Sequence, residues 1–173
     1  MNTRVRVMIL NSLSLSLVRY VMPLLININC KQVKIIKTLV LKTARAAIGY
    51  HSYYWTNSKV LKTCEWLDGI HLFYYSIICF IHKCNIDRVP KLIIINWEYT
   101  NRVGSRTIGP KMNVHMSKSS ITSNSLLHKG LFIYSRVPDS MKMKNGKIFK
   151  KMIKNMVPNS FPPNRIILQS DYG

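Results

Sequence analysis

The chain has 173 residues, of which 26 are Lys or Arg and 6 are Asp or Glu, so its formal net charge is +20. Its length suits one domain with a sizeable core, and its hydrophobic content of 47% excludes wholesale disorder. So large a charge disfavours a self-contained monomer, because like charges repel one another in a compact state. It predicts a polyanionic partner, either nucleic acid or an anionic membrane.

The first expected helix covers Val5–Leu25 and ends or kinks near Pro23. Arg4 and Arg6 precede an apolar stretch, as in a secretory signal, but serines and Arg19 dilute it and no small-x-small cleavage site follows. The same interruptions predict no stable insertion in a bilayer, which requires about 20 mainly apolar residues. The four cysteines form no CxxC pair. We therefore expect an intracellular protein, nuclear or cytoplasmic and not secreted.

The clearest amphipathic helix is predicted over Cys30–Ile48, after a short link at 27–29 and before Gly49, which is placed to stop it. Its apolar face consists of Val33, Ile36, Val40, Ala44 and Ala47. Its opposite face is a basic stripe made of Lys31, Lys34, Lys42 and Arg45. No acidic residue occurs anywhere in 1–64 to neutralise this stripe.

An aromatic loop is expected at His51–Trp55, followed by a short helix over Ser58–Leu67 that Thr56 or Asn57 would cap. The aromatic side chains of this region can stack on unpaired bases, although packing in the core is the commoner role of such residues: Tyr50, Tyr53, Tyr54 and Trp55. The next helix, predicted over Gly69–Lys83, is apolar nearly all round and should be the most buried element.

The pattern weakens after Pro90. Leu92–Trp97 is compatible with a strand or the tail of a helix, and Tyr99–Asn124 has the Ser, Asn and Gly content of a loop or linker. Ser125–Ser135 is predicted to form a short helix that ends at the Val137-Pro138 step.

A second amphipathic basic helix is expected over Lys147–Val157, ended by Pro158. Its apolar face is predicted to hold Ile148, Phe149, Met152, Ile153 and Met156, and its basic face Lys147, Lys150, Lys151 and Lys154. On phosphate-rich nucleic acid, a lysine face gains affinity by counterion release, with little dependence on base sequence.

These elements predict a mainly α protein, a small helical bundle with an irregular central-to-C-terminal loop region. Residues 1–97 would form a helical domain, 98–124 a loop or linker, 125–160 a tail with a basic helix, and 161–173 a frayed end.

The usual signatures of catalysis are missing from the sequence. It has no Asp-x-Asp or Asp-Asp pair to hold two metal ions, no Gly-rich phosphate loop and no GxSxG elbow. Cys79, His82 and Cys84 have a spacing that metal ligands can adopt, but a second ligand pair is lacking, so free thiols are expected. We therefore expect no enzymatic activity, no cofactor and no metal site.

Several short motifs follow one another along residues 8 to 160. They are Asn11-Ser12-Leu13, VLKTARAAIG at Val40–Gly49, CEWLD at Cys64–Asp68, YTNR at Tyr99–Arg102, Val137-Pro138, and FKKMIKNMV at Phe149–Val157. In this order they resemble the thumb and C-terminal tail that follow the catalytic palm in reverse transcriptases of non-LTR retrotransposons. The chain departs from that pattern at Glu65, where the family has glycine.

The resemblance implies a truncated remnant of an RNA-directed DNA polymerase whose palm, with its metal-binding aspartates, would lie upstream of Met1. Residues 1–97 would then be thumb-like, and the missing palm would be a partner of the apolar faces. By position, Lys31, Lys34, Lys42 and Arg45 would contact the template–primer duplex. The resemblance gives weaker support for the same contact by the lysines of the last helix. RNA and DNA are both possible ligands.

Two alternatives remain open on the sequence. Basic amphipathic helices also bind anionic lipid, so the chain could be a membrane-surface protein. It could equally be a degenerate reading frame with no function, since lysine, asparagine and isoleucine have A/T-rich codons. The oligomeric state is not predicted.

Overall fold

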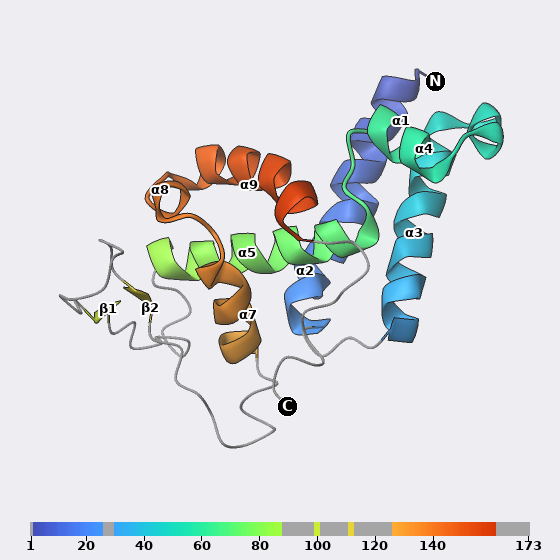
Figure 1. The fold of residues 1–173 in the computed structure, drawn as a ribbon. Coiled ribbons are helices and arrows are strands. Elements are labelled where there is room, and N and C mark those ends of the chain that lie inside the picture. The colour runs from blue at the N-terminus through green and yellow to red at the C-terminus, as the bar shows by residue number, and fades with distance from the viewer. Residues whose placement is uncertain (1, 26–29, 88–98, 101–110, 113–125, 162–173) are drawn as a thin grey trace.

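The structure is a computed structural model that describes residues 2–25, 30–87, 99–100, 111–112 and 126–161. It is mainly α, as predicted (Figure 1). In chain order the elements are α1 (Thr3–Leu10), the π-turn η1 (Asn11–Leu15), α2 (Ser16–Val21), the 3-10 turn η2 (Met22–Leu25), α3 (Cys30–Ile48), the 3-10 turn η3 (Tyr50–Tyr54), α4 (Asn57–Thr63), α5 (Gly69–Asp87), β1 (Tyr99–Thr100), β2 (Lys111–Met112), α7 (Leu126–Ser135), α8 (Asp139–Lys142) and α9 (Gly146–Ser160).

The N-terminal helical segment runs without a break from Thr3 to Leu25 and changes its winding at η1. Asn2 caps its start by accepting a hydrogen bond from the Arg4 amide at 2.9 Å. By length and mean hydropathy (1.5) this segment could cross a membrane, but signal sequences and core helices of soluble proteins share both properties. The expectation that it does not insert therefore stays a prediction.

Helix α3 has the bounds that its periodicity predicts, and Gly49 ends it with a φ of +102°. Ile36, Val40 and the two alanines of the predicted apolar face are buried. This face packs against α1, α4 and α5. The prediction of an amphipathic helix at this position is confirmed.

Helix α5 is the centre of the molecule, and helices from both ends of the chain pack on it. It continues to Asp87, four residues beyond the predicted end. Most of its side chains from Ile70 to His82 are buried, including Leu72, Tyr74, Ile77 and Ile81, whereas Lys83 and Ile86 near its end are exposed. Figure 1 shows α9 lying along one side of α5 and α7 packed against the other side. The described residues 126–160, which belong to the segment expected to be a tail, thus contribute to the same core as α1 to α5.

Three predictions about the second basic helix and its end are wrong. Ile148 is 50% exposed and does not lie on the apolar face; Phe149 and Ile153 are buried there as predicted, together with Val157. Pro158 does not end α9, because a proline in the last turn removes only one backbone donor and the helix continues to Ser160. Phe161 is not frayed; it is buried and stacks on Tyr74 with ring centroids 4.7 Å apart.

The helix predicted over Ser58–Leu67 is also shorter than expected. Thr56 is its N-cap, accepting from the Lys59 amide, and α4 ends at Thr63 because the backbone of Glu65 turns to a φ of +55°. Strands β1 and β2 pair antiparallel inside the predicted loop of 98–124, with Tyr99 opposite Met112. The predicted link at 27–29, the expected strand or helix tail at 92–97, the rest of that loop and residues 162–173 lie outside the described residues.

Candidate nucleic-acid interface

The basic stripe predicted on α3 lies on the surface of the folded chain. Lys31, Lys34 and Lys42 are exposed, and Arg45 is half-buried at the end of the helix. We call these four residues the α3 basic face. The apolar side of α3 faces the core, so the periodicity of the helix forces the cations outward. The ion pairs found in the described part of the chain are His71–Asp68 and Lys142–Asp139, and neither neutralises this face.

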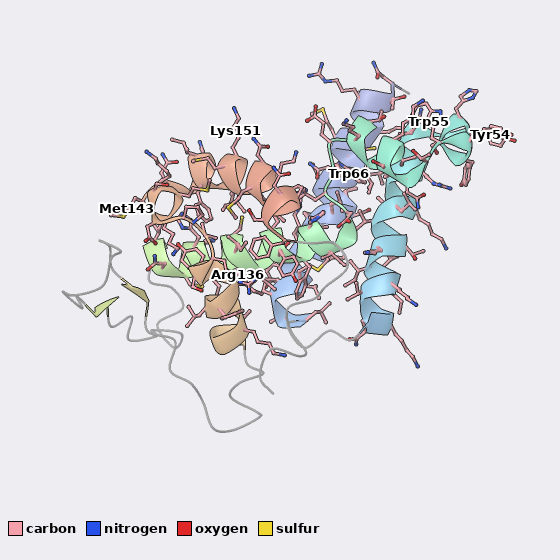
Figure 2. All side chains as sticks on the ribbon, viewed as in Figure 1. Tyr54, Trp55, Trp66, Arg136, Met143 and Lys151 are labelled. Carbon is pink, nitrogen blue, oxygen red and sulfur yellow. The ribbon has the colours of Figure 1, made fainter. Side chains whose placement is uncertain are left out.

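A cluster of aromatic side chains adjoins the C-terminal end of α3. We call Tyr50, Tyr53, Tyr54 and Trp55 the aromatic platform. The three tyrosines are 71%, 64% and 76% exposed, and Trp55 is half-buried against the core. Packing of the tyrosines in the core, the commoner role of such residues, is therefore wrong for this cluster. Figure 2 shows Tyr54 projecting outward at the edge of the molecule.

The sharp turn after α3 explains why the tyrosines remain in solvent. Gly49 adopts a backbone conformation that other residues rarely reach, and the chain then enters the single turn η3. The buried Ser52 hydroxyl donates to the Gly49 carbonyl at 2.6 Å. With Ser52 as the inward residue of the turn, the tyrosines on either side of it point away from the core.

Two cations contact the rings of the platform. The Arg45 guanidinium lies 5.7 Å from the centroid of Tyr53, and the Lys59 ammonium lies 4.5 Å from that of Trp55. Arg45 Nη2 also donates to Asn57 Oδ1 at 2.9 Å, which connects α3 to the start of α4. Lys59 was not predicted as a site residue; its only signal in the sequence is its spacing of four residues from Trp55.

The Tyr54 hydroxyl remains protonated at neutral pH. Tyr50 and Tyr54 share a hydrogen bond of 3.1 Å between their hydroxyl oxygens. That bond, followed by a small desolvation effect, raises the pKa of Tyr54 above its usual range. The Tyr54 ring thus carries no negative charge that would repel a phosphate backbone.

The second predicted basic face, on α9, lies on a separate surface. Lys147, Lys150, Lys151 and Lys154 are all exposed, and we call them the α9 basic face. In Figure 1, α3 and α9 lie on opposite sides of the N-terminal helical segment. Figure 2 shows Lys151 pointing away from the rest of the molecule. The structure therefore does not bring the eight predicted cations together.

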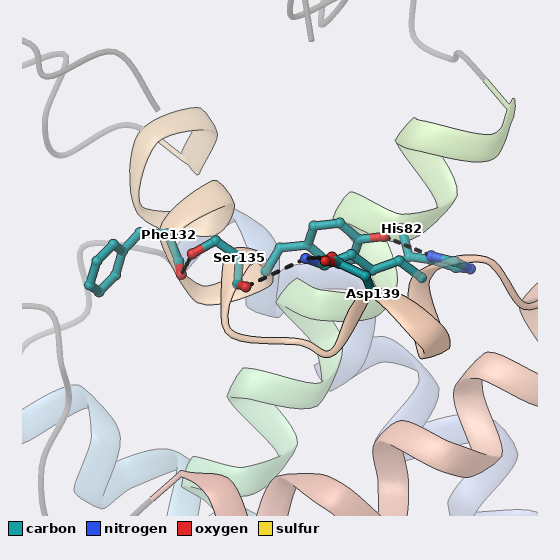
Figure 3. A network of polar contacts seen from close by, with 6 residues as sticks. His82, Phe132, Ser135 and Asp139 are labelled. Atoms are coloured by element: carbon teal, nitrogen blue, oxygen red, sulfur yellow. Dashed lines mark hydrogen bonds and ion pairs between the residues drawn. The ribbon is translucent and has the colours of Figure 1, made fainter. Parts of the chain in front are cut away.

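The residues considered for metal binding take part in packing and hydrogen bonds. His82 is buried, its Nδ1 lies 3.0 Å from the Tyr134 hydroxyl, and its ring stacks on Phe149 with centroids 3.4 Å apart. Figure 3 shows the hydrogen bond of His82. Beside it, the Lys142 ammonium donates to Asp139 at 2.8 Å and to the Ser135 carbonyl at 3.4 Å. Within the described ranges no three His, Cys, Asp or Glu side chains cluster as metal ligands would.

The two half-buried or buried thiols with shifted pKa values are poor nucleophiles. Burial raises the pKa of Cys64. Burial also raises the pKa of Cys79, to about 11, although a hydrogen bond from Tyr75 and nearby cations oppose this shift.

Comparison with protein-family models, curated proteins and solved structures finds no match to this chain.

Proposed function

We propose that the chain binds nucleic acid without strong sequence preference, through the α3 basic face and the aromatic platform. The observation that carries this proposal is the set of exposed tyrosines next to Arg45 and Lys59. Exposed aromatic rings flanked by cations are the combination that single-stranded nucleic acid requires.

Each group has a distinct task in this mechanism. The lysines of the α3 basic face neutralise phosphates and release counterions, which makes binding weaker as salt rises. The rings of Tyr53 and Tyr54 stack on unpaired bases, so a single strand should bind more tightly than a duplex. The α9 basic face would add phosphate contacts for a ligand long enough to reach it.

We further propose that the chain derives from the thumb and tail that follow the palm in a non-LTR retrotransposon reverse transcriptase, and that these residues do not themselves catalyse a reaction. One structural observation supports this origin. Glu65 stands where the family has glycine, and its backbone has a φ of +55°, a conformation that favours glycine. A reading frame for a polymerase palm in the DNA upstream of Met1 would support this origin, and a frame unrelated to polymerases would contradict it.

Membrane binding by the two basic helices has less support. The apolar faces of α3 and α9 are covered by α1, α4 and α5 and are not free to enter lipid.

Fluorescence anisotropy with labelled single-stranded RNA and duplex DNA, each at two salt concentrations, tests nucleic-acid binding. We expect the Tyr53→Ala, Tyr54→Ala double variant to bind single strands roughly tenfold or more weakly, because each stacked base contributes about 1–3 kcal/mol. Tyr20→Ala is the matched control, since Tyr20 is 79% exposed but lies away from the α3 basic face. Binding that is undetectable at low salt, or independent of salt, would refute the proposal.

A further inference from the structure

A groove of about 1,070 Å³ lies between α2, α5 and the first turn of α9. Its volume is just above the roughly 300–1,000 Å³ usual for ligand pockets. The walls come from segments far apart in the sequence: Arg19 and Leu24 from the N-terminal segment, Tyr75 and Phe80 from α5, and Lys150 from α9. The groove shares Lys147 and Lys150 with the α9 basic face, but it contains no residue of the α3 basic face or of the aromatic platform.

The charged side chains of the groove are all cations. Arg19, Lys83, Lys147 and Lys150 line it, and no Asp or Glu is among the described residues that do so. Arg19 and Lys150 are close enough to Cys79 to favour its thiolate electrostatically. The Nε of Arg19 is buried and has no hydrogen-bond partner. These features call for an anionic ligand group.

The remaining lining indicates a hydrocarbon chain and not a nucleotide base. Most of it is apolar: Tyr20, Pro23, Leu24, Phe80 and Ile86. The polar side chains are largely engaged within the protein. The Ser76 hydroxyl donates to the Leu72 carbonyl at 2.8 Å, and Asn145 accepts from the Ile148 amide at 3.1 Å. A base would need free hydrogen-bonding groups at its edges, whereas an acyl chain needs none.

A row of exposed apolar side chains leads to the mouth of this groove along the N-terminal helical segment. Val5, Ile9, Leu13 and Leu17 are spaced by four residues, and Tyr20 and Leu24 continue the row into the groove. Their exposed fractions are 44%, 42%, 68%, 65%, 79% and 73%. We call these six residues the apolar stripe. The other side of the segment, including Leu15 and Met22, is in the core, so the segment can lie on a membrane while the fold stays intact.

We propose that this face binds an anionic phospholipid bilayer, with the apolar stripe at the membrane surface, an acyl chain in the groove, and the lipid phosphate on Arg19, Lys147 and Lys150. Charge complementarity commits the site to this occupant, because a neutral apolar partner would leave those cations without counter-charges.

Flotation of the full chain with phosphatidylcholine vesicles, with and without phosphatidylserine, tests the proposal. We expect binding only to the anionic vesicles. The Lys147→Gln, Lys150→Gln variant should bind roughly 25-fold more weakly, since each cation near an anionic surface contributes roughly a fivefold factor. The Lys31→Gln, Lys34→Gln variant carries the same charge change on the α3 basic face and should lose less than about twofold, because distant charges are screened.

A second pair of changes separates the stripe from the groove. Leu13→Asn with Leu17→Asn removes apolar side chains that are already exposed, so the fold should persist, as circular dichroism would verify. We expect this variant to bind anionic vesicles at least roughly tenfold more weakly. Equal binding to neutral vesicles, unchanged binding by either variant, or binding of monomeric oleate or inorganic phosphate but not of vesicles would each overturn the proposal. Retention of the protein on the vesicles after an alkaline carbonate wash would show that it inserts into the bilayer, and this would contradict binding at the membrane surface.

The same variants keep this proposal separate from the proposed function. Loss of vesicle binding with unchanged RNA affinity in the Leu13→Asn, Leu17→Asn variant would establish two independent surfaces. RNA binding with no vesicle binding in the unaltered chain would refute the lipid site alone.

Discussion

The end of α4 offers a sharp test of how backbone strain limits stability in this fold. The Trp66 amide donates to the Leu61 carbonyl at 2.9 Å, and the Glu65 amide donates to the Lys62 carbonyl at 3.0 Å. This pair of bonds is the Schellman ending of a helix, in which the residue after the C-cap takes a left-handed conformation. Glu65 does so with a φ of +55°, although glycine is the residue that usually fills this position.

We expect Glu65→Gly to stabilise the protein. A left-handed conformation costs a residue with a Cβ about 1–2 kcal/mol, whereas glycine adds about 0.5–1 kcal/mol of backbone entropy to be lost on folding. The difference is a gain of about 0.5–1 kcal/mol. For a chain of this size, that corresponds to a rise in Tm of roughly 1–4 °C. The side chain of Glu65 is exposed, so little packing is lost.

The matched control is Glu65→Ala, which removes the same negative charge but keeps a Cβ. Since the net charge is already +20, losing a carboxylate should itself be slightly unfavourable, and the control measures that effect. Urea unfolding followed by circular dichroism gives both free energies of unfolding. If the glycine variant were no more stable than the alanine variant, the strain at this position would be absent and the reasoning wrong.

Three further predictions concern stability, each measured by urea unfolding. A Cβ at Gly69 would lie 2.8 Å from the α3 backbone, so Gly69→Ala should lower the free energy of unfolding by about 1–3 kcal/mol. At Gly146 nothing lies within 4 Å of such a Cβ, so Gly146→Ala should raise the free energy of unfolding by about 0.4–1 kcal/mol. Equal effects of the two substitutions would contradict the close approach at Gly69. Tyr134→Phe removes the buried 3.0 Å bond to His82 and should cost about 1–3 kcal/mol, and no loss would mean that the bond contributes nothing. Burial raises the pKa of Cys79 from 9.0 to about 11, so the unfolded thiol ionises first as pH rises. The free energy of unfolding should therefore fall between pH 9 and pH 11, and it should fall less in the Cys79→Val variant than in the unaltered chain. An equal decline in both proteins would show that Cys79 is not the group responsible.

The parts of the fold that could be predicted from the sequence are those with a strong periodic pattern. Helix α3 was predicted to the residue, because its apolar and basic faces alternate at the helical period and Gly49 marks its end. Helix α5 was predicted as buried because it is apolar all round. By contrast, the early end of α4 depends on a left-handed glutamate, which no pattern of polarity indicates.

The candidate sites were predicted only in part. The lysines of both basic faces are exposed as expected, but the exposure of Tyr50 and Tyr54 could not be predicted, because composition does not say whether an aromatic cluster faces the core or the solvent. The groove could not be predicted at all. Arg19 and Lys150 are more than a hundred residues apart, and only the packing of α9 on α5 brings their neighbourhoods together.

The π-turn η1 marks the one place in the N-terminal helical segment where a change of length should do little harm. A π-turn accommodates one residue more than an α-helical turn does, so deletion of a single residue between Asn11 and Leu15 would restore ordinary winding and leave α1 and α2 in nearly the same rotational register. A deletion within α2 would instead rotate α1 by about 100° relative to η2, because each residue of an α-helix advances by that angle. Val7 and Leu10 would then leave the core, and exposed side chains of the apolar stripe would turn towards α3.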